Sequence, residues 1–288
     1  MNSLGEQFLI NMDQGKANEG AVFSGQKYRI TILTERLVRF EYNEEGFFED
    51  RPTQLVLSRK FDVPQVSVRE DDRFIEITSR YFKIEYSKNK PFSASRIVPG
   101  GNLRVTLQST DRVWYYGHPE VRNYSSTAVS LDGADDKVKL KKGLYSTDGF
   151  VSLDDSDSYV FNQDGTLSPR EKKVVDIYLF AYRKDFGLCL KDYFDLTGKP
   201  PLLPRYALGN WWSRNYSYSE ADMLNLLNTF EKYEIPLSVL LLDKDWHIRN
   251  YEKKKDLETG YSFNKQLIPT PYEFINKLHS KNLKLGLN

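Results

Sequence analysis

Cysteine and net charge are scarce in this chain of 288 residues. Cys189 is the sole cysteine, so no disulfide can form within the chain, and we expect its side chain to be a small buried hydrophobe. Lysine plus arginine number 41 and aspartate plus glutamate 40, so there is no basic excess to attract nucleic acid or an anionic membrane surface. The longest aliphatic run, Val239–Leu242, is far too short to span a bilayer. The first twenty residues carry no signal-peptide pattern, so we expect a cytoplasmic protein.

Short chemical motifs are also missing. The sequence has no GxGxxG and no P-loop to cradle a nucleotide, no HExxH or CxxC pair to bind zinc, and no GxSxG nucleophile elbow. An acidic cluster at residues 154–157 lacks the glycine and distal glutamate of an EF-hand loop, and a turn in which side chains cap the local backbone explains it better. We therefore expect neither a cofactor nor a metal ion.

Aromatic residues, in contrast, are abundant. The chain holds 19 tyrosines, 17 phenylalanines and 4 tryptophans, which make up 14% of its residues. Such a composition is typical of β-structure and also suits stacking against the faces of sugar rings.

Residues 27–188 show the alternating pattern of short β-strands. Residues 28–34 and 37–42 are separated by two residues and predict a hairpin. Similar runs follow at 53–57, 66–69, 74–78, 82–86, 103–107 and 174–180, with turn-forming clusters between them. This pattern predicts that residues 1–200 form an antiparallel β-sandwich domain, or a barrel.

After the proline-rich linker at residues 200–204, the spacing of hydrophobic residues changes from the period of two typical of strands to the period of 3.6 typical of helices. Residues 208–213 read as a buried strand, Ser219 begins a capping box that opens a helix, and 238–242 form a second buried strand. Pro271 marks the first turn of another helix, and the residues from Lys284 to Asn288 begin a third strand. Residues 201–288 thus predict the start of a (β/α) barrel, truncated at Asn288. A small complete α/β lobe is the competing interpretation.

Two constellations lie where a barrel would place its active site. Asp243 follows the aliphatic run directly, and strand alternation predicts that Asp243 and Asp245 point to one side. With Trp246 and His247, such a carboxylate could bind sugar hydroxyls, although a solvated turn is about equally consistent with this position.

The second constellation follows the first parallel strand. Trp211 and Arg214 offer a stacking surface and a fixed cation, while one tryptophan of the pair Trp211 and Trp212 is expected in the core because neighbouring side chains of a strand point opposite ways.

The ordered motifs resemble glycoside hydrolase family 31, which contains α-glucosidases and α-xylosidases. The strongest likeness is Leu203-Pro-Arg-Tyr-Ala-Leu-Gly-Asn-Trp-Trp-Ser-Arg214 followed by residues 235–247. Residues 48–54, 131–133, 146–149, 153–156, 193–198 and 283–288 are similar to the family as well. The resemblance implies a galactose-mutarotase-like β-sandwich followed by the first units of a (β/α)8 TIM barrel.

The resemblance also implies a retaining mechanism with two aspartates, a nucleophile and a general acid/base, on later barrel strands. Both are expected beyond Asn288, so we expect this chain to be inactive alone. Asp243 matches the family aspartate that binds hydroxyls of the terminal sugar, and Asp148 resembles the sandwich-loop aspartate near the leaving-group sugar. The residue after the motif arginine, usually aromatic, is Asn215, which leaves the preferred sugar open.

The expected partner is thus an oligosaccharide with terminal α-linked sugars, with no nucleic acid and no membrane, and self-association of the whole protein is left open. Two alternatives remain at this point. A metal-dependent glycosyltransferase would use Asp243-Lys244-Asp245 as its metal-binding motif. A non-catalytic carbohydrate-binding module would use aromatic residues of the sandwich and would not need Asp243.

Overall fold

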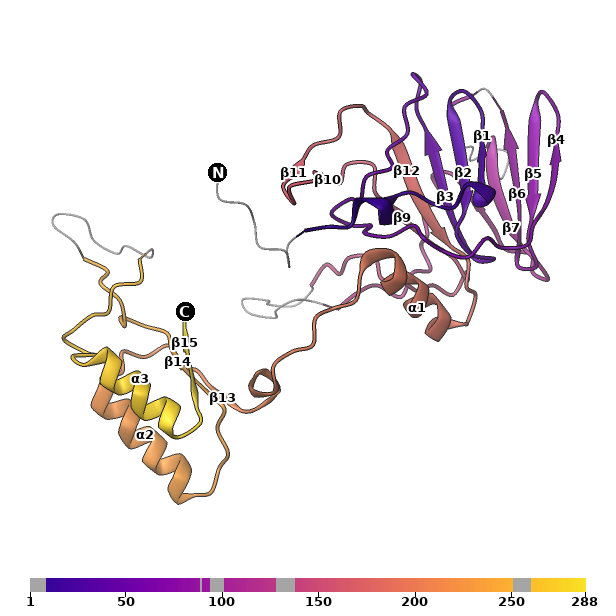
Figure 1. The fold of residues 1–288 in the computed structure, drawn as a ribbon. Helices are drawn as coiled ribbons and strands as arrows, with labels where there is room; N and C mark the ends of the chain where they lie inside the picture. Colours follow the sequence, from indigo (N-terminus) through magenta and orange to yellow (C-terminus); the bar gives the residue numbers. More distant parts are fainter. Residues whose placement is uncertain (1–8, 89, 94–100, 128–137, 251–259) are drawn as a thin grey trace. The chain divides into compact units, whose positions relative to one another are not determined.

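The computed structural model describes residues 9–88, 90–93, 101–127, 138–250 and 260–288. The chain divides into two compact units, unit 1 (Met1–Pro200) and unit 2 (Pro201–Asn288). Figure 1 shows the ribbon of both units. Within the described ranges no helix is both long and apolar enough to cross a membrane. The family-like motif at residues 131–133 lies outside the described residues.

Unit 1 is built on two antiparallel sheets of five strands each. The first has the order β1-β2-β3-β12-β9 and comprises Val22–Ser24, Tyr28–Ile32, Leu37–Tyr42, Val175–Phe180 and Val151–Asp154. The second has the order β4 to β8 and comprises Ser67–Glu70, Phe74–Thr78, Phe82–Ser87, Leu103–Leu107 and Val113–Tyr115. A separate pair joins β10 (Val160–Phe161) to β11 (Leu167–Ser168). The predicted hairpin is confirmed, because β2 pairs antiparallel with β3.

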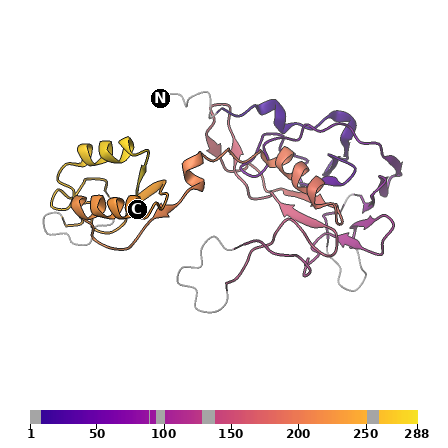
Figure 2. The same ribbon diagram turned by 90° about the horizontal axis from the view of Figure 1, so that it is seen from below.

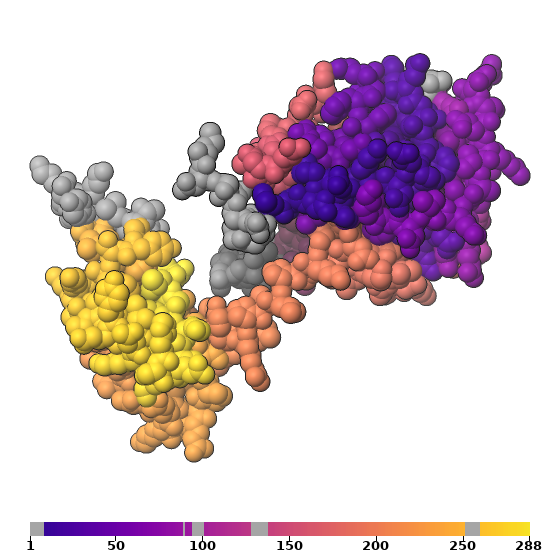
Figure 3. Space-filling view, viewed as in Figure 1, coloured from indigo at the N-terminus to yellow at the C-terminus, as the bar shows by residue number. Residues whose placement is uncertain are grey.

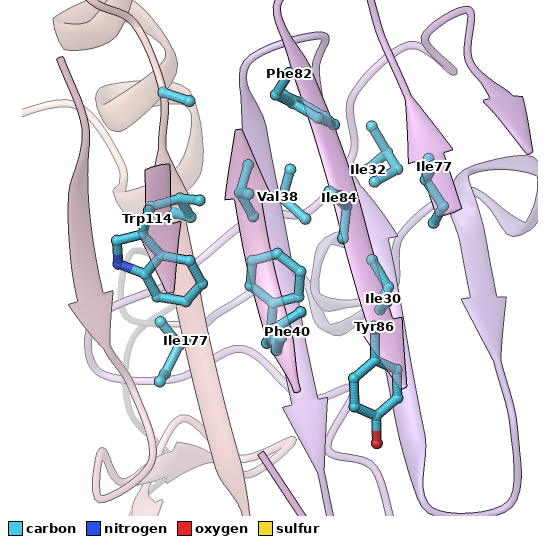
Figure 4. Close-up of a cluster of buried hydrophobic side chains, with 14 of the residues drawn as sticks. Ile30, Ile32, Val38, Phe40, Ile77, Phe82, Ile84, Tyr86, Trp114 and Ile177 are labelled. Atoms are coloured by element: carbon cyan, nitrogen blue, oxygen red, sulfur yellow. The ribbon is translucent and has the colours of Figure 1, made fainter. Parts of the chain in front are cut away.

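Buried side chains of both sheets meet in one hydrophobic cluster (Figure 4). Tyr28 of β2 meets Tyr86 of β6 edge-on, with ring centroids 5.0 Å apart, and Phe40 of β3 stacks on Trp114 of β8 at 5.6 Å. Alternation along each strand supplies one apolar face per sheet, and burying the two faces against each other removes both from water. Unit 1 accordingly forms one continuous body in the space-filling view (Figure 3).

The sequence patterns did not predict the helix α1 (Phe186–Thr197), whose buried residues belong to another hydrophobic cluster of unit 1. Figure 2 shows this helix beside the strands of unit 1. Asp185 caps it by accepting a hydrogen bond from the Leu188 amide, and Gly198 ends it at φ 93°. Cys189 on this helix is 2% exposed, which confirms its prediction as a buried hydrophobe. The strand expected at 53–57 is absent, since Thr53 makes only an isolated bridge to Val160.

Unit 2 contains three parallel strands in the order β13-β14-β15, connected by two helices. In chain order they are β13 (Trp211–Trp212), α2 (Glu220–Lys232), β14 (Val239–Leu242), α3 (Pro271–Ser280) and β15 (Lys284–Leu287). The capping box of Ser219 with Asp222 and the proline at the start of α3 are confirmed. Leu240 and Leu242 share a cluster with residues of both helices, such as Met223 and Phe274.

One expectation for unit 2 needs correction. The buried strand predicted at 208–213 is limited to two residues, because residues 205–208 form a 3₁₀ helix and Leu208 is 75% exposed. Within the described residues the parallel strands form an open sheet of three, and the expectation was the first units of an incomplete barrel.

Candidate functional site

The carboxyl edge of the parallel sheet gathers the polar residues of unit 2. Strands β13, β14 and β15 run in the same direction, so the residues after Trp212, Leu242 and Leu287 emerge at one edge. In open α/β sheets this edge is where ligands bind. Asp243 and Asn288 lie side by side there, because the Asn288 side-chain amide donates a hydrogen bond to Asp243 Oδ1 at 3.2 Å.

One carboxylate oxygen of Asp243 has no hydrogen-bond partner among the described residues. The strand ends at Leu242, as expected, and Asp243 is partly exposed just beyond it. Among the described residues only Asn288 donates to this carboxylate, and it does so through Oδ1. Oδ2 therefore remains as an acceptor for a ligand's hydroxyl groups, and a carboxylate makes stronger hydrogen bonds to such donors than a neutral group.

Asp245 lies in a different setting from Asp243. Its carboxylate accepts a hydrogen bond from the Ser217 hydroxyl and lies 3.5 Å from an Arg249 nitrogen, and its carbonyl accepts one from the Asn264 side chain at 3.1 Å. The Ser217 hydrogen bond, with help from Lys244 and Arg249, lowers the pKa of Asp245 below its ordinary value.

The expectation that Asp243 and Asp245 point to one side extended the side-chain alternation of the strand to residues after Leu242. That expectation is corrected: the strand stops at Leu242, and a φ of 57° at Asp245 turns the chain. Asp245 thereby joins the loops that follow β13 and β14, whereas Asp243 keeps an oxygen available.

Strand β13 and the loop after it carry an exposed aromatic and a cation. Trp211 is 47% exposed, whereas Trp212 packs edge-on against Phe230 of α2 at 5.5 Å, so one tryptophan of the pair belongs to the core as expected. The Arg214 guanidinium lies over the Tyr216 ring at 5.1 Å. Asn215 is exposed between them. The strand therefore presents a stacking surface to solvent, and the loop after it presents hydrogen-bond donors.

Trp246 and His247 are placed mainly in the interior of unit 2. Trp246 is 2% exposed, contacts the rings of Tyr261 and Phe263, and donates its indole N–H to the Asn288 carbonyl at 2.8 Å. Burial makes it a support for the sheet edge rather than an open stacking face. His247 is 8% exposed, and its Nδ1 has no hydrogen-bond partner among the described residues. It lines a cleft of about 1030 Å³ together with Asp245.

Asp148, the candidate in unit 1, lies in a tight turn before β9. Its Oδ1 is 3.1 Å from an Arg112 nitrogen and 3.5 Å from an Arg122 nitrogen. The turn is closed by a Gly149 amide that donates to the Ser146 carbonyl, and Gly149 adopts a φ of 82° that favours glycine. Asp148 is 8% exposed and lines a cavity of about 540 Å³ in unit 1.

The acidic cluster at 154–157 splits between two roles. Asp154 caps its own turn by accepting from the Ser156 amide at 3.0 Å, in line with the expected backbone-capping turn. Asp155 is instead fully buried and accepts a hydrogen bond from Arg170 at 3.0 Å. No group of three or more histidine, cysteine, aspartate or glutamate residues in the described ranges could hold a metal ion.

Sequence reasoning missed Asn288 as a site residue. Its signal was present, because it follows a predicted parallel strand just as Asp243 does. The two arginines around Asp148 could not be found in this way, because Arg112 and Arg122 come from separate loops of unit 1.

Comparison with known proteins supports the resemblance to glycoside hydrolase family 31. Residues 200–288 match the sequence model of the family 31 TIM-barrel domain of glycosyl hydrolases. The chain is 29% identical over 176 residues to an α-xylosidase of Saccharolobus solfataricus, which covers 58% of this chain and 22% of that protein. It is 30% identical over 175 residues to α-glucosidase 2 of Bacillus thermoamyloliquefaciens, which covers 59% of this chain and 19% of the relative. The matched segments thus span about a fifth of these relatives.

A solved structure shows the same fold. A Flavobacterium johnsoniae GH31 dextranase complexed with glucose superposes with a TM-score of 0.56 at 16% identity and covers 92% of this chain and 36% of its own. The matches confirm the resemblance to glycoside hydrolase family 31 read from the sequence motifs, and residues 200–288 match the TIM-barrel domain of that family.

Proposed function

We propose that this chain is the substrate-binding, N-terminal part of a retaining α-glucosidase-type hydrolase that acts on terminal α-linked sugars of oligosaccharides. In this proposal unit 1 serves as the family's β-sandwich and unit 2 as the first strands of its (β/α)8 barrel. The observation that carries the proposal is Asp243, which lies at the carboxyl edge of β14 with one carboxylate oxygen unpartnered among the described residues.

In this proposal, residues at and near the sheet edge make different contacts with a bound sugar. Asp243 Oδ2 accepts hydrogen bonds from hydroxyls of the terminal sugar, and Asn288 fixes the orientation of the carboxylate through Oδ1. Trp211 offers its exposed ring to the apolar face of a sugar, while Arg214, Asn215 and His247 supply polar contacts.

Bond cleavage needs two further carboxyl groups. In a retaining glycosidase an aspartate attacks the anomeric carbon as the leaving-group oxygen takes a proton from a second acid, and water then releases the sugar from the covalent intermediate. We propose that both aspartates lie beyond Asn288, and that Asp148 contacts the leaving-group sugar. The chain by itself would then bind sugar without turning it over.

The metal-dependent glycosyltransferase alternative fits the geometry less well. It requires the carboxylates of Asp243 and Asp245 to converge on one cation. The Asp245 carboxylate is occupied by the Ser217 hydroxyl and by Arg249, and the turn at Asp245 separates its direction from that of Asp243. A carbohydrate-binding module without catalysis would make no use of the parallel sheet edge.

The proposal is tested by turnover of p-nitrophenyl α-glucoside and p-nitrophenyl α-xyloside. The 288-residue chain should give no rate above buffer, whereas the chain extended by its downstream coding sequence should hydrolyse at least one of them with retention. Asp243→Asn in the extended protein should lower kcat/KM about tenfold to a hundredfold, the worth of a charged hydrogen bond to the sugar. Turnover by the short chain, or an extended protein indifferent to Asp243→Asn, would refute the proposal.

A further inference from the structure

The cavity beside Asp148 combines aromatic rings with an excess of cations. It measures about 540 Å³, large enough for a disaccharide, and its walls come entirely from unit 1. The aromatic walls are Tyr81, Tyr124, Tyr182 and Phe186, and the cationic ones are Arg36, Arg112, Arg183 and Lys184. Rings suit the faces of pyranose sugars, so the cations decide which sugar fits.

Two of the four cations are already paired. Arg36 lies over the Tyr81 ring at 3.8 Å and bonds Asp185 at 2.9 Å, and Arg112 bonds Asp148 at 3.1 Å.

The other two cations in the cavity wall have no such partner. The side chains of Arg183 and Lys184 make no hydrogen bond or ion pair with any residue in the described ranges. They are therefore unpaired cations in a cavity wall that also holds three carboxylates, Asp111, Asp148 and Asp185.

The backbone holds Arg183 against the Asp148 turn in a conformation that few arginines adopt. Arg183 has a φ of 59°, in the left-handed region where a side chain is strained. Its amide donates to the Gly149 carbonyl at 2.8 Å, and a Cβ on Gly149 would come within 3.0 Å of the Arg183 Cα. The Arg183 backbone is therefore fixed against the turn that carries Asp148, and such local strain is often found at binding sites.

We infer that this cavity binds a hexuronic acid residue of an oligosaccharide. Arg183 and Lys184 would pair with the uronate carboxylate, since the planar guanidinium matches a carboxylate in two parallel hydrogen bonds. Asp148 Oδ2, which has no partner among the described residues, would accept a sugar hydroxyl, and the exposed ring of Tyr124 would face the sugar. The inference rests on the proposed function, in which Asp148 contacts a sugar of the substrate. It adds that this sugar is a hexuronic acid.

The test is calorimetric titration of the 288-residue chain with two disaccharides, maltose and its analogue in which glucuronic acid replaces one glucose. The acidic disaccharide should bind about tenfold more tightly, because it forms charge-assisted hydrogen bonds with two unpaired cations, and added salt should narrow the difference. Arg183→Gly combined with Lys184→Gln should abolish the preference. Glycine accepts the left-handed backbone, so thermal stability should hold or rise.

The matched control is Arg69→Gln, which removes an exposed cation from strand β4, outside the cavity. It should leave the preference intact. Equal affinity for the two disaccharides, binding of neither, or a preference that survives the double variant would overturn the inference. The proposed function is decided separately, by turnover in the extended protein and its dependence on Asp243.

Discussion

Replacing Arg39 by methionine should destabilise unit 1 by about 3 kcal/mol at pH 7, the low end of the range for breaking a buried ion pair. The Arg39 side chain is 2% exposed and donates twice to Asp176, at 2.8 and 2.7 Å, and once to the Glu49 carbonyl at 2.9 Å. Methionine fills similar space but donates nothing, so Asp176 keeps a buried charge. The low end applies because Arg170 still donates to Asp176 at 2.9 Å.

The effect should depend on pH in a defined direction. Burial alone raises the pKa of Asp176, but Arg39 and its neighbouring arginines outweigh it and lower the pKa from 3.8 to about 2. A carboxyl whose folded pKa is lowered stabilises the protein above its unfolded pKa and loses that contribution as the pH falls through the folded pKa. The wild-type contribution of Asp176 should therefore be complete above about pH 4 and fade toward pH 2.

In Arg39→Met the pKa of Asp176 should rise, because burial is no longer outweighed to the same degree. Protonation then relieves the uncompensated charge, so the stability gap between variant and wild type should shrink as the pH falls below 7. Urea unfolding followed by circular dichroism at several pH values measures this gap.

The matched control is Arg104→Met, which removes the cation of an exposed cross-strand pair. Arg104 is 44% exposed and lies 2.6 Å from Glu85, so its loss should cost only about 0–1 kcal/mol. The double variant Arg39→Met with Asp176→Leu should recover part of the stability lost in Arg39→Met, because it removes the unpaired buried carboxylate. Equal costs for Arg39→Met and Arg104→Met, or a gap that widens on acidification, would refute the reasoning.

Three further predictions concern local features. Ser219→Ala removes the capping box of α2 and should destabilise unit 2 by about 1 kcal/mol in urea unfolding, whereas Ser213→Ala should change little; equal effects would contradict the cap. Burial raises the pKa of Cys189 to about 12, so the thiol of the folded protein should not react with thiol reagents at pH 8 and should react only after unfolding. Fast labelling of Cys189 in the folded protein would contradict this. Asp245→Asn should cost about 0.5–1 kcal/mol and speed hydrogen exchange at Ser217. Because the folded pKa of Asp245 is lowered, the cost should begin to shrink below its ordinary pKa and vanish only below the lowered folded pKa; a cost that grows in acid would contradict it.

Local signals in the sequence predicted much of unit 2. The capping box at Ser219 and the proline at the start of α3 depend on neighbours along the chain, and the aliphatic run of β14 marks a buried strand by composition alone. The position of Asp243 followed from the rule that parallel strands end at a common edge.

Features set by distant segments were not predictable in this way. Alternation along β3 suggests that Arg39 and Glu41 face water, but both are buried, and Arg39 bonds the carbonyl of Glu49 from the following segment. Similarly, the separation of Asp243 from Asp245 depends on the turn at Asp245 and on its contacts with Ser217 and Arg249.

The most direct test of the central account is whether Asp243 binds sugar. Calorimetric titration of the chain with an α-linked disaccharide should give an affinity that falls about tenfold or more in Asp243→Asn, because the charged acceptor is lost. Asp157→Asn, which changes an exposed carboxylate of unit 1, is the matched control and should leave the affinity unchanged. Equal affinities for wild type and Asp243→Asn would contradict the assignment of this sheet edge as the sugar-binding site.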